Sequence, residues 1–236
     1  MRVGILYADD LGEDVISEYG DYADMFQNLL QCVDKTLSFS TYHVTRAEYP
    51  STIDVCDAYL LTGSKFGAYE DEDWIRQLTK FIIELHRQEK KLTGICFGHQ
   101  LIAHALGGLA QKSEKGWGMG VMSSDVNQAA DKCAWLTPGK DSFSLLVSHQ
   151  DQVVKLPPGA ELVASNVFCP IAAFRIGESV LTFQGHPEFS VEYPRYIMDN
   201  RREQLGEEKY SRALSSLRQP IDSELVAQWL VNFITG

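Results

Sequence analysis

The segment Gly94-Ile95-Cys96-Phe97-Gly98 constrains the fold more than any other part of this chain. It places one cysteine between two glycines, directly after an apolar run and before a helical pattern. A strand that turns so sharply into a helix leaves no room for flanking side chains, and it points the central side chain out of the sheet edge. The sulfur would also lie at a helix N-terminus, where unpaired N–H groups favour the thiolate. The segment therefore predicts an α/β fold that carries a reactive Cys96.

The rest of the first half agrees with such a fold. Short apolar runs are typical of buried strands, and apolar residues that recur every three or four positions are typical of helices packed on a core. The expected strands lie at 2–8, 37–45, 57–62 and 91–95, and the expected helices lie at 15–33, 71–86 and 98–106. Because strands and helices alternate, we expect a parallel sheet with helices on both faces.

The second half changes in character. Short strand-like runs are joined by turns that contain glycine or proline, and a helical pattern resumes from Pro194. The expected strands lie at 119–126, 143–148, 160–168, 171–176 and 179–184. We therefore predict a central, mostly parallel sheet flanked by helices, with an additional small β region. Since no repeat, low-complexity segment or linker interrupts the 236 residues, we expect a single domain over residues 1–236.

Composition excludes several classes of function. The formal net charge of −11, with lysine and arginine scattered along the chain, argues against nucleic-acid binding. No apolar stretch approaches the roughly 18 residues that a membrane span needs, and the N-terminus turns acidic too early for a signal peptide. The five cysteines are odd in number and contain no Cys-x-x-Cys pair, so neither disulfides nor a metal site is indicated. We expect a cytoplasmic protein without a cofactor that acts on a small molecule.

A base for the cysteine is found far downstream, at His186-Pro187-Glu188. A thiol at its ordinary pKa is mostly protonated at neutral pH, so it needs a base or a positive field. His186 follows an apolar strand, which places it at the sheet edge where open α/β folds bind ligands. Glu188 is close enough in sequence to hold the far ring nitrogen of His186. Together with Cys96, these residues predict acyl transfer on amides, thioesters or esters.

Acyl transfer also needs donors for the developing oxyanion. The backbone N–H of Phe97 is one candidate by position, and Gly63, at the end of a neighbouring parallel strand, is the other. His149 lies in a polar turn after a strand, where a binding role and a turn role are equally supported. We interpret His99 and His104 as packing or polar-face residues. Each motif alone has an ordinary explanation, such as a surface ion pair for His186 and Glu188.

The segments 94–100, 148–151 and 184–188 resemble the class I glutamine amidotransferases in motif, order and separation. The resemblance implies a flavodoxin-like α/β glutaminase domain that hydrolyses a γ-carboxamide through a γ-glutamyl thioester. It implies that Cys96 is the nucleophile, His186 the general base and acid, and Glu188 the residue that orients His186.

The same resemblance extends to the residues around the triad. It implies that Gly63 and Phe97 form the oxyanion hole, and it assigns recognition of the α-amino and α-carboxylate groups of glutamine to three further residues: Gln100, Ser148 and His149. Segments 19–26 and 115–118 are similar to stand-alone GMP synthetase-like amidotransferases, a subgroup that includes γ-glutamyl peptidases.

Two departures from that subgroup's relatives shape the expected function. A bifunctional GMP synthetase continues into an ATP-pyrophosphatase domain, whereas this chain ends at Gly236 and contains no Gly-x-x-x-x-Gly-Lys loop. We therefore expect either a glutamine amidohydrolase that releases ammonia, on its own or to a separate synthase subunit, or a γ-glutamyl peptidase. Gly185 replaces a tryptophan that is common before the catalytic histidine, so we expect a more open pocket wall. Loop 65–73 is expected to cover the pocket.

Two other readings remain as alternatives. A binding or regulatory module could keep the fold without turnover, although the intact set of Cys96, His186 and Glu188 argues against it. An α/β-hydrolase with a cysteine nucleophile is weaker, because that fold usually places its acid before a late histidine and here the acid follows it.

Overall fold

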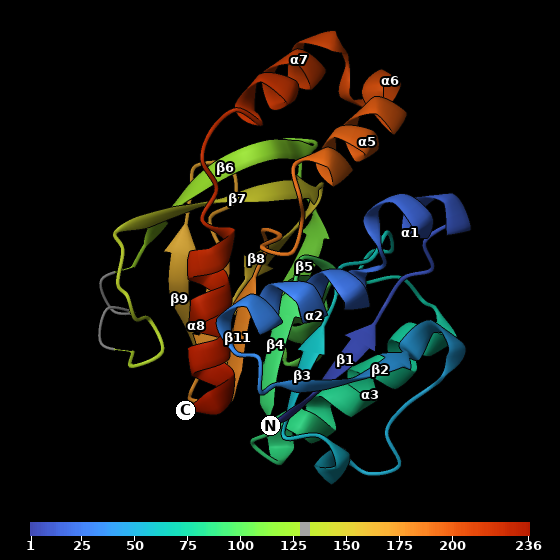
Figure 1. The fold of residues 1–236 in the computed structure, drawn as a ribbon, viewed down its shortest axis with the longest axis vertical. Helices are drawn as coiled ribbons and strands as arrows, with labels where there is room; N and C mark the ends of the chain where they lie inside the picture. Colours follow the sequence, from blue (N-terminus) through green and yellow to red (C-terminus); the bar gives the residue numbers. More distant parts are fainter. Residues whose placement is uncertain (128–132) are drawn as a thin grey trace.

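The computed structural model describes residues 1–127 and 133–236, which form two sheets surrounded by helices (Figure 1). The strands of the larger sheet are β1 (Arg2–Tyr7), β2 (Ser38–His43), β3 (Ala58–Leu61), β4 (Lys91–Ile95), β6 (Gly118–Val126), β7 (Ser142–His149), β9 (Ala160–Ser165), β10 (Ala173–Ile176) and β11 (Val180–Phe183). They lie side by side in the order β2-β1-β3-β4-β11-β10-β9-β6-β7. The smaller sheet pairs β5 (Leu109–Lys112) with β8 (Asp151–Lys155).

The larger sheet has a parallel part and an antiparallel part. Strands β2, β1, β3, β4 and β11 are parallel to one another, and β10, β9, β6 and β7 continue the sheet in antiparallel pairs. The predicted α/β fold is thus confirmed, but most of the expected separate β region belongs to the main sheet. Strands β5 and β8 were not expected. Only Gln150 separates the end of β7 from the start of β8, so this single residue carries the chain from one sheet to the other.

Helices cover both faces of the parallel part (Figure 1). Helices α2 (Tyr22–Val33) and α8 (Ser223–Thr235) pack on one face, and α3 (Asp73–Arg87) and α4 (Phe97–Ala105) pack on the other. Leu60 joins the first core and its neighbour Leu61 joins the second, because successive side chains of a strand point to opposite faces. A strand that is buried on both faces needs a continuous apolar run, which is what the sequence has here.

The long helix expected at 15–33 is instead two helices, α1 (Glu13–Tyr19) and α2. Gly20 has a φ of 79°, which ends α1, and Asp21 starts α2 with a capping box that it shares with Asp24. Both features favour a break over a continuous helix. Because the apolar periodicity continues through Gly20, this pattern could not reveal the break between α1 and α2.

A third group of helices covers the β6–β7 end of the molecule (Figure 1). It contains α5 (Glu192–Asn200), α6 (Arg202–Leu205) and α7 (Glu207–Ser216), which share an apolar cluster with α2 and β1. The cluster includes Tyr7, Tyr22, Phe189, Tyr193 and Met198. The carboxyl ends of β1, β3, β4 and β11 therefore meet beneath residues from the C-terminal helices. No helix in the described ranges is long and apolar enough to cross a membrane.

Candidate active site

Cys96 occupies the turn between β4 and α4. Its φ of 54° is positive, an unusual value for a residue other than glycine. A Cβ atom on Gly94 would lie 2.7 Å from the carbonyl oxygen of Gly98, and one on Gly98 would lie 2.4 Å from that of Leu61. The backbone N–H of Cys96 donates to the carbonyl oxygen of Phe183 at 2.9 Å. The predicted elbow is therefore present, and its tightness explains both glycines.

His186 is held on one ring nitrogen and on one face. Its Nδ1 lies 2.6 Å from Oε1 of Glu188, and both side chains are buried. The ring of Phe189 stacks on the imidazole with a centroid separation of 3.9 Å and an interplanar angle of 8°. Since Nδ1 is occupied, Nε2 is the nitrogen left to exchange a proton with Cys96, which lines the same cavity as His186.

The charge on His186 depends on its partners. Burial alone would lower the pKa of His186, but the carboxylate of Glu188 and the charge on Cys96 together raise it above its ordinary value. Cys96 lies directly before the first residue of α4, so its sulfur is next to both the imidazole of His186 and a helix N-terminus. The three residues can therefore hold a nucleophilic sulfur and a proton that is ready for transfer.

Two backbone N–H groups next to Cys96, those of Gly63 and Phe97, have no protein partner among the described residues. A Cβ atom on Gly63 would lie 3.0 Å from Cε1 of His186 and 3.8 Å from the Cβ of Cys96. Phe97 is the first residue of α4, a position whose N–H has no partner within the helix. In the described parts of the chain, neither N–H donates to another protein group. Both are therefore available to an oxygen atom bound beside Cys96.

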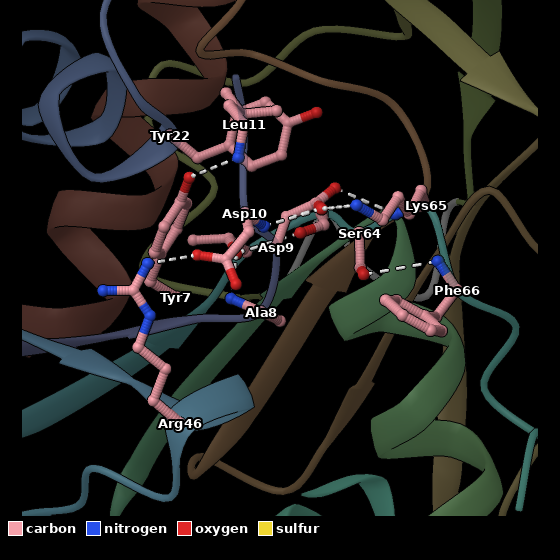
Figure 2. Close-up of polar contacts among 12 residues, drawn as sticks. Tyr7, Ala8, Asp9, Asp10, Leu11, Tyr22, Arg46, Ser64, Lys65 and Phe66 are labelled. Atoms are coloured by element: carbon pink, nitrogen blue, oxygen red, sulfur yellow. Dashed lines mark hydrogen bonds and ion pairs between the residues drawn. The ribbon is translucent and has the colours of Figure 1, made fainter. Parts of the chain in front are cut away.

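The loop that follows Gly63 is tied to the end of β1 (Figure 2). Oδ2 of Asp9 accepts a hydrogen bond from the backbone N–H of Lys65 at 3.0 Å, and Oδ1 accepts one from that of Asp10 at 2.8 Å. The hydroxyl of Thr62 accepts from the N–H of Ala8 and donates to the carbonyl oxygen of Gly63, both at 3.0 Å. These bonds fix the backbone around Gly63. In the sequence, Asp9 stands out only as part of an acidic pair after the first strand.

Gln100 and His149 line the site, but much of their bonding capacity is used within the protein. Nε2 of Gln100 donates to the carbonyl oxygen of Asp151 at 2.8 Å and to Oε1 of Gln184 at 3.0 Å, which leaves its own oxygen for a ligand. Nδ1 of His149 bonds the same carbonyl at 3.0 Å. Burial and the nearby charge of His186 lower the pKa of His149 to about 4, so it is neutral at physiological pH. Its Nε2 is buried and has no partner in the described residues.

Two cavities meet at Cys96. The polar lobe, about 200 Å³, is lined on one side by Tyr69, Glu70, Gln100, Trp117, His149 and Asp151. The aromatic lobe, about 190 Å³, is lined on the other side by Asp9, Tyr22, His186, Phe189, Tyr193 and Ile197. Residues of both lobes include Ser64, Lys65, Cys96, Ser148 and Arg201. Cys96 therefore lies between two compartments, and His186 lines the aromatic one.

Several expectations about this region can now be judged. All the named site residues lie together at the carboxyl edge of the sheet. Residues of the loop at 65–73 line the polar lobe, as expected for a loop over the pocket. The expectation for Gly185 is wrong, because it lines neither lobe, and a Cβ atom there would lie 2.9 Å from the Cβ of Leu145 in β7. His99 is a packing residue, bonded to the hydroxyl of Thr182 at 2.8 Å.

Sequence reasoning missed the residues that reach the site from the C-terminal helices. Arg201 lies between α5 and α6, and Tyr193 lies in α5. Nη1 of Arg201 donates to the hydroxyl of Ser148 at 3.0 Å, so the predicted binding residue Ser148 is held from this side. Among the residues that the structure describes, no group of three His, Cys, Asp or Glu side chains is arranged to hold a metal ion.

Comparison with known proteins agrees with this geometry. The family model described as glutamine amidotransferase class-I matches residues 21–200. A glutamine amidotransferase-like protein of Schizosaccharomyces pombe is 32% identical and aligns over 99% of this chain and 98% of its own. Gamma-glutamyl peptidase 3 of Arabidopsis thaliana is 29% identical over 100% of this chain and 97% of its own. The crystal structure of a glutamine amidotransferase from Thermotoga maritima superposes with a TM-score of 0.73 at 21% identity, covering 99% of this chain and 96% of that one.

Proposed function

We propose that this chain, which belongs to the class I glutamine amidotransferases, hydrolyses γ-glutamyl amide bonds through a γ-glutamyl thioester on Cys96. The relatives of the chain support an amidohydrolase-type activity. One observation carries the proposal: Cys96 sits in a strained elbow beside His186, whose far nitrogen lies 2.6 Å from the buried carboxylate of Glu188. This arrangement has the three roles of an acyl-transfer triad.

In the first half of the reaction the thiolate of Cys96 attacks the γ-amide carbon. The carbonyl oxygen becomes an oxyanion, which the N–H groups of Gly63 and Phe97 stabilise. His186 donates its proton to the amide nitrogen, the C–N bond breaks, and the free amine departs. The γ-glutamyl group remains on the sulfur as a thioester, and His186 is neutral.

In the second half, neutral His186 accepts a proton from water as the water oxygen attacks the thioester carbon. The C–S bond then breaks, glutamate is released, and the thiolate of Cys96 and the protonated His186 are restored. Glu188 stays ionised throughout and holds the ring of His186 in one orientation, which is the role of the third member of such a triad.

The polar lobe suits the γ-glutamyl group. Its carboxylates, Glu70 and Asp151, and the free side-chain oxygen of Gln100 can face an α-ammonium group. Ser148 and His149 are the proposed positions for the α-carboxylate. An amino acid that carries both charges matches such a wall better than an apolar ligand does.

Two leaving groups are open to this chemistry. With glutamine the product is ammonia, which is released or passed to a separate synthase subunit. With a γ-glutamyl peptide the product is an amino acid or a peptide, and the aromatic lobe favours this second substrate. Its volume of about 190 Å³ far exceeds the roughly 30 Å³ that one water molecule, similar in size to ammonia, occupies. Because His186 lines this lobe, the departing nitrogen would face it.

The test is to incubate the protein with glutamine and with γ-glutamyl-alanine and to measure the release of ammonia and of alanine. We expect turnover of at least one substrate, and we expect Cys96→Ala to abolish it. Cys169→Ala is a matched control, because burial raises the pKa of the Cys169 thiol to about 12 and this residue lines neither lobe. Inertness toward both substrates, or full activity of Cys96→Ala, would contradict the proposal.

A further inference from the structure

Arg201 is a partly buried cation at the boundary between the two lobes. Its guanidinium stacks on the ring of Trp117, with 4.3 Å from Cζ to the ring centroid, and it donates to the hydroxyl of Ser148. An aromatic face and a neutral hydroxyl orient a guanidinium, but neither cancels its charge. Arg201 is therefore held in one position with its charge still available.

Arg201 also differs from the other arginine that is withdrawn from water. The side chain of Arg175 is 15% exposed and forms ion pairs with Glu161 and Glu178. No carboxylate lies within ion-pair distance of Arg201 among residues 1–127 and 133–236. Burial lowers the pKa of Arg201, so the site disfavours the unpaired charge. A cation in this situation is stabilised by a bound anion.

The surroundings of Arg201 decide which anion fits. Arg201 lines the aromatic lobe together with His186, Tyr22 and Tyr193, so its guanidinium is open to a ligand that leaves past His186. Lys65 is the other cation shared by the two lobes, but its Nζ lies 3.4 Å from Oδ1 of Asp9 and is already compensated. Among the described residues, Arg201 is thus the cation shared by the two lobes that has no ion-pair partner, and one side of it faces the lobe that His186 lines.

We propose that Arg201 binds the α-carboxylate of the leaving amino acid, so that the preferred substrates are γ-glutamyl amino acids with a free carboxylate next to the scissile bond. The inference rests on the proposed function and extends it by naming the leaving group. In an α-amino acid the carboxylate lies two bonds from the nitrogen. With the nitrogen facing His186, the carboxylate stays close to Cys96, within the space that Arg201 shares with both lobes. A planar guanidinium binds a carboxylate in a bidentate manner, which gives specificity as well as affinity.

The test compares γ-glutamyl-alanine with γ-glutamyl-alaninamide, which keep the same γ-glutamyl group and differ only in the leaving carboxylate. We expect Arg201→Gln to lower kcat/KM for the free acid by about 10- to 100-fold, because a hydrogen bond between charged groups is lost. The loss should fall mainly on KM. For the amide the loss should be less than about threefold, since the missing contact is not made. Arg201→Lys, which keeps the charge without the planar fork, should be intermediate.

Arg202→Gln is the matched control. Arg202 is the next residue, but it is exposed and paired with Glu207, so its loss should leave the ratio of the two kcat/KM values unchanged. Equal losses of Arg201→Gln on both substrates would overturn the inference, because Arg201 would then serve the γ-glutamyl group or the fold. Activity equal to that of the unmodified protein on both would overturn it as well. If the unmodified protein cleaves neither compound nor glutamine, the proposed function itself fails, and the two failures are thereby distinguished.

Discussion

The two walls around Cys96 are built in different ways. The wall on the side of the elbow is made largely of backbone. Gly94 and Gly98 allow the tight turn, and Gly63 and Phe97 offer their N–H groups. The aromatic lobe is made of side chains that converge from the segment after β1, from α2 and α5, and from the segment after β11. Few substitutions leave a backbone wall in a tight turn intact, whereas the side chains of the aromatic lobe can be substituted without disturbing that turn. Under the proposed function, the elbow sets the reaction and the aromatic lobe selects the leaving group.

The largest effect is expected from Glu188→Gln. We expect kcat to fall by about 10² or more on every substrate, because His186 loses its orienting charge. Burial, which lowers the pKa of His186, would then prevail. The alkaline limb of the pH profile of kcat/KM should therefore move to lower pH, whereas Glu207→Gln, at an exposed carboxylate, should leave the profile unchanged. Identical pH profiles for Glu188→Gln and the unmodified protein would contradict this role.

The same pair should affect stability in a defined pH window. Because the folded protein raises the pKa of His186 from 6.5 to about 10, the contribution of this residue is complete below 6.5 and is lost as the pH rises through about 10. The free energy of unfolding should decline over this window more steeply in the unmodified protein than in Glu188→Gln. Denaturant titrations at several pH values measure the difference, and parallel curves would count against the raised pKa.

Gly98→Ala tests whether the elbow is fixed by sterics. The added Cβ would lie 2.4 Å from the carbonyl oxygen of Leu61, so we expect a loss of about 2–4 kcal/mol in the free energy of unfolding. Gly139→Ala is the control, since the nearest atom to its Cβ is 3.7 Å away. Urea unfolding measures both. Equal stability of the two variants would show that the elbow tolerates a side chain and that its shape has another cause.

The smallest effect is expected from Asp9→Asn, because Asp9 acts on the chemistry only through the loop. An amide keeps one of the two acceptors that hold Lys65 and Asp10, so the Gly63 backbone should loosen. We expect kcat to fall about tenfold on all substrates, less than the roughly 10²–10³ for loss of a whole oxyanion donor. Asp34→Asn, at an exposed aspartate that caps a turn far from the site, should have no effect on kcat. A loss confined to substrates with large leaving groups would instead assign Asp9 to recognition within the lobe.

The sequence predicts these two walls unequally, for a physical reason. The elbow and His186-Pro187-Glu188 are local patterns, since the residues that act together are neighbours in sequence or end strands of one sheet. Arg201 reaches the site only through packing of distant elements, and its neighbours in sequence carry no sign of it. Asp9 follows β1 at the same sheet edge, but an acidic pair after a strand does not indicate which backbone groups it will bind. The prediction of an open pocket wall at Gly185 failed for a related reason, because the space beside this residue is filled by Leu145 of the neighbouring strand β7. The break at Gly20 escaped detection because apolar spacing continues across it.

Under the proposed function, Cys96 carries a γ-glutamyl group whose identity does not depend on the leaving group. The direct test is rapid acid quenching of the reaction with glutamine and, separately, with γ-glutamyl-alanine, followed by mass spectrometry of the peptide that contains Cys96. We expect the same mass increase on Cys96 from both substrates, equal to one γ-glutamyl group. An adduct whose mass depends on the leaving group, or an adduct on a different residue, would contradict it.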